Sequence, residues 1–314
     1  MKINLIEYFE NTIKKYADKV AVWDKERYAT FAELENYSKS LAWKIFQDNE
    51  IFKKPIAVYL NKSIESVYAD MAIIYSGNFY MNLDVKTPAE RIKNILELIQ
   101  PAAIITNNQF EKNIKNVIPA GIDMINLDSV IWDDIKCDDK TLLQRLETLI
   151  DTDPLCIINT SGSTGTPKGV VLNHRSFFDF TEWAQEEFGF TDHEVIGSLS
   201  PLVFDIYSYE LCLLMSRGST MVLIPDNLSA FPVTILKLLE EKKVSFIFWV
   251  PTIMVNIANM DLLSQIQLAG LPERYFRRSN STTGIVNCLM SCSPIYTDLS
   301  KSRWIVPILK WNVS

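Results

Sequence analysis

Short stretches rich in β-branched and aromatic residues alternate with helix-like segments along most of this chain. Such stretches at 20–23, 56–60, 102–106, 155–158, 195–199, 220–224 and 245–250 predict strands. Apolar residues recur at helical spacing in the segments 5–16, 63–75, 177–188, 207–216 and 233–242. Strands that alternate with helices form parallel pairs joined by crossovers. The pattern therefore predicts an α/β fold with parallel-rich sheets flanked by helices.

Two helix starts carry the pattern of a capping box, in which a hydroxyl residue is followed three positions later by Glu or Gln. Thr30 and Glu33 form one such pair. The second start has Thr87, then Pro88 at the expected first helical position, and Glu90. We expect a helix to begin directly after each hydroxyl residue.

The overall charge excludes some classes of partner. The chain has 31 Lys and Arg against 38 Asp and Glu, a net charge of −7. It therefore has no global basic field that would hold nucleic acid or an anionic membrane. Its longest apolar run, 246–255, is shorter than the ~20 residues that cross a bilayer. The first residues lack the apolar core of a signal peptide, so we expect a cytoplasmic protein.

Cysteine and histidine are too sparse for several common kinds of site. The five cysteines form no CxxC pair, and His174 and His193 are the only histidines. A familiar zinc cluster is therefore not expected. Nucleophilic catalysis with a histidine base would also have very few candidates.

The glycine-rich run TSGSTGTPKG, residues 160–169, is the strongest candidate for chemistry. Three of the ten glycines of the chain lie in it, directly after an expected strand. Glycines permit a tight turn with exposed amide groups, hydroxyls add donors, and a lysine adds positive charge. The phosphate-binding candidates are Thr160, Ser161, Gly162, Ser163, Thr164, Gly165, Lys168 and Gly169. The alternative is a polar turn between two strands.

The run is not the P-loop of kinases and GTPases. The pattern GxxxxGK[ST] would need Gly at Pro167 and Ser or Thr at Gly169. Instead, TSGSTGTPKG resembles the phosphate-loop signature of the AMP-forming adenylating superfamily. This superfamily includes acyl-CoA synthetases, luciferases, adenylation domains of nonribosomal peptide synthetases and D-alanine:carrier-protein ligases. The resemblance implies that the loop holds the phosphates of ATP.

Two other segments support the resemblance in the expected order. Residues 72–84, AIIYSGNFYMNLD, are similar to a family motif of the type KAGAAYVPLD, although Ser76 and Asn78 differ from it. FDIYSYEL, residues 204–211, resembles the motif FDxSxxEL, with Tyr207 in place of the usual Ser. In members that activate amino acids, the Asp of this motif holds the α-ammonium group, which implies that role for Asp205. The alternative for Asp205 is a helix N-cap before Tyr207.

The resemblance covers residues 5–266 and then stops. Several features that the family would show next are not found in 269–314. They are a GE segment, the motif NxYGPTE with its adenine-packing Tyr and magnesium-holding Glu, a ribose-binding Asp, and a C-terminal domain with a catalytic Lys. Charge also changes there, since six basic and two acidic residues follow Leu268. A shifted reading of the codons permits Asn-Leu-Tyr-Gly-Pro-Ile-Glu across 294–301. This compatibility favours a frameshift over a natural basic appendage.

The expected organisation is therefore a partial adenylation domain at 1–266 and a poorly packed tail, unrelated to the family, at 267–314. The truncated large N-terminal domain would lack the small C-terminal domain, and no catalytic residue is assigned in this frame. The resemblance implies ATP, with Mg²⁺, and an amino acid as substrates, and a phosphopantetheine carrier protein as partner. No prosthetic group is expected. Two alternatives remain, a non-catalytic nucleotide- or partner-binding fragment and an acyl-CoA synthetase-like ligase.

Overall fold

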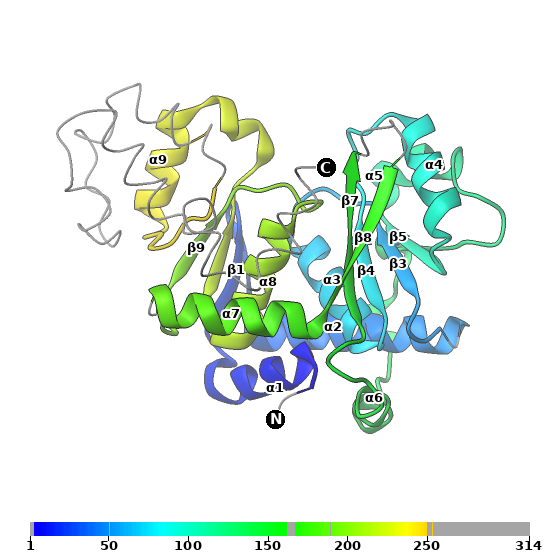
Figure 1. Cartoon of the computed structure of the whole chain (residues 1–314), viewed down its shortest axis with the longest axis horizontal. Helices are drawn as coiled ribbons and strands as arrows, with labels where there is room; N and C mark the ends of the chain where they lie inside the picture. The colour runs from blue at the N-terminus through cyan, green and yellow to red at the C-terminus, as the bar shows by residue number, and fades with distance from the viewer. Residues whose placement is uncertain (1–2, 50, 162–166, 189, 250–252, 254–314) are drawn as a thin grey trace, which may run out of the picture.

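The computed structural model describes residues 3–49, 51–161, 167–188, 190–249 and 253 (Figure 1). Two sheets form the body of the described chain. The six-stranded sheet has the order β6-β5-β3-β4-β7-β8, and the four-stranded sheet has the order β2-β1-β10-β9. The strands are β1 Val20–Asp24, β2 Arg27–Thr30, β3 Pro55–Val58, β4 Phe79–Asn82, β5 Ala103–Thr106, β6 Asp123–Asn126, β7 Pro154–Ser161, β8 Pro167–Asn173, β9 Val195–Ser198 and β10 Thr220–Leu223.

Most neighbouring strands run parallel, as the alternating sequence pattern predicts. The exceptions are the pairs β1–β2 and β7–β8, which are antiparallel. The α-helices of the described residues are α1 Leu5–Tyr16, α2 Phe31–Asn49, α3 Ile64–Tyr75, α4 Ala89–Ile99, α5 Asn108–Lys115, α6 Asp139–Leu146, α7 His174–Phe188, α8 Asp205–Arg217 and α9 Pro232–Glu241. The predicted α/β class with helix-flanked, parallel-rich sheets is thus confirmed.

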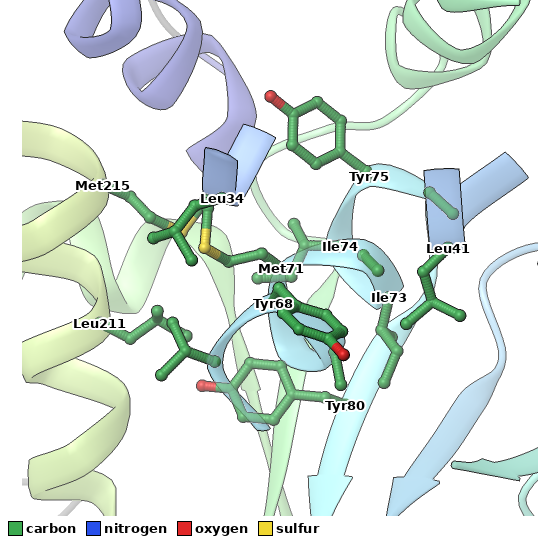
Figure 2. Close-up of a cluster of buried hydrophobic side chains, with 14 of the residues drawn as sticks. Leu34, Leu41, Tyr68, Met71, Ile73, Ile74, Tyr75, Tyr80, Leu211 and Met215 are labelled. Carbon is green, nitrogen blue, oxygen red and sulfur yellow. The ribbon is translucent and has the colours of Figure 1, made fainter. Parts of the chain in front are cut away.

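Helices α3 and α8 lie between the two sheets (Figure 1). Every residue of α3 except Glu65 is buried, and most of α8 is buried too. Figure 2 shows Met71 of α3 facing Leu211 and Met215 of α8 in the apolar core that they share. The two sheets are therefore joined through this helix pair. A polar side chain buried there lowers the stability of the fold unless it forms a hydrogen bond.

The capping predictions have different outcomes. At Thr30, the Glu33 amide donates to the hydroxyl and the Thr30 amide donates to the Glu33 carboxylate, as predicted. The prediction at Thr87 is wrong. Helix α4 begins at Ala89, and its N-cap, Pro88, has no side-chain acceptor. The Thr87 amide instead donates to the Asp84 carbonyl, 2.9 Å away, in the preceding turn.

The strand predicted at 245–250 is also only partly formed. Within the described residues, Phe246 forms a single parallel bridge with Ile196 of β9, without a continuing ladder. The Gly197 amide donates to the Phe246 carbonyl at 2.9 Å. Residues 254–314 lie outside the described residues, so the poor packing expected for 267–314 stays a prediction.

Candidate functional site

The glycine-rich run joins two paired strands. Thr160 on β7 pairs with Lys168 on β8, and Ser161 pairs with Pro167. The Thr160 hydroxyl also donates to the Lys168 carbonyl at 3.4 Å. The loop is therefore shorter than the predicted segment 160–169, because both flanks belong to the antiparallel ladder. Four of the predicted phosphate contacts, Gly162, Ser163, Thr164 and Gly165, lie outside the described residues.

Lys168 is exposed at the point where β8 leaves this loop. No ion pair of the described residues involves its ammonium group. A cation in this position is available to an anionic ligand held by the loop, because it has no competing carboxylate among those residues. The predicted role of Lys168 stays a prediction.

The structure gives a packing reason for the glycine at position 169, whereas the sequence suggested a turn. It pairs with Asn159 in the ladder, and its φ is not in the left-handed region. A Cβ at this position would lie 2.7 Å from Ile99 Cδ1 and 3.0 Å from Ile157 Cγ2. Helix α4 therefore packs closely on β8, and a larger residue at this position would require the Ile99 and Ile157 side chains to shift.

Asp205 is the first residue of α8. The N-cap is Phe204, which makes no side-chain capping bond, so the alternative of Asp205 as an N-cap is wrong. Its carboxylate accepts from the adjacent Ile206 amide at 3.0 Å. Asp205 is half-buried, and burial raises the pKa of its carboxyl group. The helix N-terminus favours the negative charge, but no ion pair of the described residues involves this carboxylate.

Asp205 and the strand leading to the glycine-rich loop are electrostatically coupled. Burial raises the pKa of the Cys156 thiol on β7 to about 12, and the charges of Asp70 and Asp205 add to this rise. Coulombic effects of this kind act over short range in a protein interior. Cys156 lies near the start of β7, whereas the glycine-rich loop follows its last residue, Ser161, so this effect does not place Asp205 beside the loop.

Sequence reasoning missed a buried carboxylate in α3. Asp70 is wholly buried and accepts from Tyr207 Oη at 2.8 Å and from Asn82 Nδ2 at 3.0 Å, both at Oδ2. Burial raises the pKa of Asp70 to about 7, although both hydrogen bonds act in the opposite direction. The signal in the sequence was a lone acidic residue within the apolar stretch VYADMAIIY.

Sequence reasoning also missed a buried lysine that ties the two sheets together. Lys62, after β3, donates to the Leu199 carbonyl at 2.8 Å and to the Ile224 carbonyl at 3.2 Å, at the carboxyl ends of β9 and β10. Its ammonium group also lies 3.3 Å from Asp226 Oδ1. Burial lowers the pKa of Lys62, and these oxygens compensate for its lost hydration. Ligands of open α/β sheets bind at such strand ends.

Metal and membrane signatures were searched over the described part of the chain. There, no group of three or more His, Cys, Asp or Glu side chains could hold a metal ion. Helices long and apolar enough to cross a membrane are also lacking among these residues.

Comparison with curated proteins finds relatives among peptide synthetases. The chain is 26% identical over 250 residues to zwittermicin A synthase ZmaJ of Bacillus cereus, covering 78% of this chain and 45% of the relative. It is also 26% identical over 218 residues to tyrocidine synthase 1 of Brevibacillus parabrevis, covering 69% of this chain and 20% of that protein. The chain thus spans less than half the length of these relatives.

Comparison with solved structures finds the same fold. The nonribosomal peptide synthetase FmoA3, bound to α-methyl-L-serine-AMP, matches with a TM-score of 0.71 and 21% identity, covering 82% of this chain and 28% of FmoA3. VinN matches with a TM-score of 0.70 and 16% identity, covering 84% of this chain and 66% of VinN. At this identity the likeness shows the fold alone.

The family described as AMP-binding enzyme matches residues 9–302. The match continues past residue 266, where the recognisable motifs end. The boundary between 266 and 267 stays a prediction, since it lies outside the described residues. A match over most of the chain, together with the shared fold and the relatives above, settles the family. This chain belongs to the AMP-binding enzyme family.

Proposed function

We propose that the residues 1–266 are the substrate-binding part of an amino-acid adenylation domain. Asp205 binds the ammonium group of an amino acid, and the loop 160–169 binds the phosphates of ATP, which enters with Mg²⁺. In the complete reaction, a carboxylate oxygen of the amino acid attacks the α-phosphorus, and the bond from that phosphorus to pyrophosphate breaks. The aminoacyl-AMP then loads a phosphopantetheine carrier protein.

The observation that carries this proposal is the unpaired carboxylate of Asp205. It is half-buried, its pKa is raised by burial, and no ion pair of the described residues involves it. A partly desolvated carboxylate is stabilised when a cation binds it. A ligand ammonium group supplies that cation, whereas a fatty acid or an aryl acid without an amine does not. The curated relatives are peptide synthetases, which supports the same substrate class.

The 314-residue chain itself is proposed to be non-catalytic. Adenylation builds charge on the α-phosphate and the departing pyrophosphate, and its catalysis depends on magnesium and a positioned lysine as well as on the loop. The motif implied for holding the adenine and the magnesium is not found in residues 269–314. The chain would therefore bind substrates without turning them over.

Calorimetric titration with D-alanine and with propionate, each in the presence of Mg²⁺ and ATP, tests this assignment. The two ligands share the carboxylate and the methyl group, so their difference reports on the amine. Wild type is expected to bind D-alanine more tightly, and Asp205→Asn is expected to remove that preference. Equal affinities of wild type for the two ligands would instead favour an acyl-CoA synthetase-like ligase, which recognises acids without an amine.

A further inference from the structure

Tyr207 occupies a Ser position of the motif FDxSxxEL but does not lie at the surface. Its side chain is wholly buried between the sheets, and its hydroxyl donates to Asp70 Oδ2 at 2.8 Å. The contact joins α8, which carries Asp205, to α3. Burial raises the pKa of the Tyr207 hydroxyl, so the hydroxyl keeps its proton and acts as the donor.

Asp70 is in turn held by β4. Asn82 Nδ2 donates to the same oxygen, Oδ2, at 3.0 Å, and both residues are buried. Asn82 and Tyr207 therefore meet at one buried carboxylate. The result is a continuous hydrogen-bonded connection from the central sheet through α3 to the first turn of α8.

This connection can influence the rotation of α8 about its own axis. Successive residues of a helix are about 100° apart, so Asp205 and Tyr207 lie about 200° apart, on opposite faces. A rotation of about 20° would move a side chain at a helix radius of about 6 Å by about 2 Å. A contact at Tyr207 that limits this rotation would therefore also limit movement of the Asp205 carboxylate on the other face.

Other contacts of α8 do not replace it. Thr12 of α1 donates to the Met215 carbonyl at 2.8 Å, which holds the far end of the helix. Tyr209 lies two residues after Tyr207 and is also buried, but its hydroxyl has no hydrogen-bond partner among the described residues. Its ring packs against Phe180 and Phe248. The Tyr207 hydrogen bond ties the first two turns of α8 to α3. Ser208 and Glu210 of the same turns also face neighbouring strands, at Tyr80 and Ser198.

We propose that Asp70 is a positioning residue for Asp205, acting through the hydroxyl of Tyr207. The proposal rests on the amine-binding role proposed for Asp205. It assigns no contact between Asp70 and a ligand, because Asp70 is wholly enclosed between α3, β4 and α8. Its carboxylate oxygen acts as the fixed acceptor against which the first turn of α8 is set.

Two matched pairs of variants test the proposal. Tyr207→Phe removes the hydrogen bond, whereas Tyr209→Phe removes a buried hydroxyl without a partner from the same helix. Asp70→Ala removes the acceptor, whereas Asp70→Asn keeps an oxygen that accepts from Tyr207. The first readout is hydrogen exchange of the backbone amides 208–212, and the second is the calorimetric affinity for D-alanine in the presence of Mg²⁺ and ATP.

Tyr207→Phe and Asp70→Ala are expected to speed exchange at 208–212 and to weaken D-alanine binding about tenfold. Tyr209→Phe and Asp70→Asn should stay within about twofold of wild type in both readouts. The proposal would be overturned if Tyr207→Phe showed the same exchange rates and affinity as wild type. It would also be overturned if Asp70→Asn were as impaired as Asp70→Ala. If Asp70→Ala does not fold, Tyr207→Phe and Asp70→Asn still decide it.

The two readouts separate this proposal from the amine-binding role of Asp205. If wild type binds neither D-alanine nor any other amino acid, the amine-binding role fails, and the exchange readout alone decides whether the Tyr207 contact sets α8. If wild type binds and Asp205→Asn does not, the affinity of Tyr207→Phe decides the positioning role directly.

Discussion

Replacing His174 with Asn should remove the loss of stability that this one residue causes at acidic pH. His174 begins α7, is 1% exposed, and accepts at Nδ1 from the Leu5 amide of α1 at 3.2 Å. Burial lowers the pKa of His174 from 6.5 to about 4, although Asp153 and Asp151 partly oppose this change. The amide oxygen of Asn keeps an acceptor for the Leu5 amide but takes up no proton in this range.

The sign and size follow from proton linkage. Below pH 6.5 the unfolded chain binds a proton at His174 that the folded chain does not bind. The contribution of His174 to wild-type stability therefore falls as the pH falls from 6.5 to 4. At 1.36 kcal/mol per pKa unit, the contribution of this group falls by about 3 kcal/mol over the whole range and by about 2 kcal/mol at pH 5. Asp70 and Glu210 have raised pKa values and act in the opposite direction, but equally in both proteins.

Urea unfolding followed by circular dichroism at pH 7 and pH 5 measures the effect. The stability of His174→Asn relative to wild type should rise by about 2 kcal/mol between pH 7 and pH 5. The comparison between proteins cancels the contributions of the other titrating groups. The same difference at both pH values would show that His174 is not a buried neutral histidine, and would refute this reasoning.

Three further outcomes are expected. Lys168→Ala should weaken ATP binding by about 1.5–3 kcal/mol, which is the free energy of one charge-assisted contact. Calorimetric titration with ATP measures this, and an unchanged affinity would show that Lys168 is not part of the site. Gly169→Ala should destabilise the fold by about 1–3 kcal/mol through overpacking against Ile99. In urea unfolding, the additional change Ile99→Ala should relieve part of this loss, whereas an equal loss with and without Ile99→Ala would argue against the packing role. D-alanine binding should weaken on acidification at a higher pH than for an ordinary aspartate, because burial raises the pKa of Asp205. Titrations from pH 7.5 down to about pH 3.9, the pKa of an ordinary aspartate, measure this, and a constant affinity would contradict ammonium binding.

The sequence pattern predicted the α/β class and most element positions because those depend on local periodicity. The helix predicted at 207–216 forms α8, Asp205–Arg217, and the strand predicted at 220–224 forms β10, Thr220–Leu223. The strand at 245–250 is reduced to one bridge at Phe246 in the described residues. Strand formation there depends on a partner in another part of the chain, which a local pattern does not reveal.

The site was predictable only where a motif carried it. Asp205 was found through FDIYSYEL, whereas Asp70 and Lys62 were missed. Tyr207, the donor to Asp70, is 137 residues away, and Lys62 donates to carbonyl oxygens of Leu199 and Ile224, which are 137 and 162 residues away along the chain. The motif singled out Gly169 for phosphate binding, a role that stays a prediction, and did not reveal how closely this position is packed. Its constraint comes from Ile99 on α4, a contact across the fold that no local motif describes.

Amino-acid-dependent exchange of pyrophosphate into ATP tests the central claim most directly. It should be measured with the 314-residue chain and with a chain whose downstream reading frame is restored after Leu268, using D-alanine and a panel of other amino acids. The account predicts no exchange above background for the first chain and amino-acid-dependent exchange for the second. Robust exchange by the 314-residue chain, or none after the frame is restored, would contradict it.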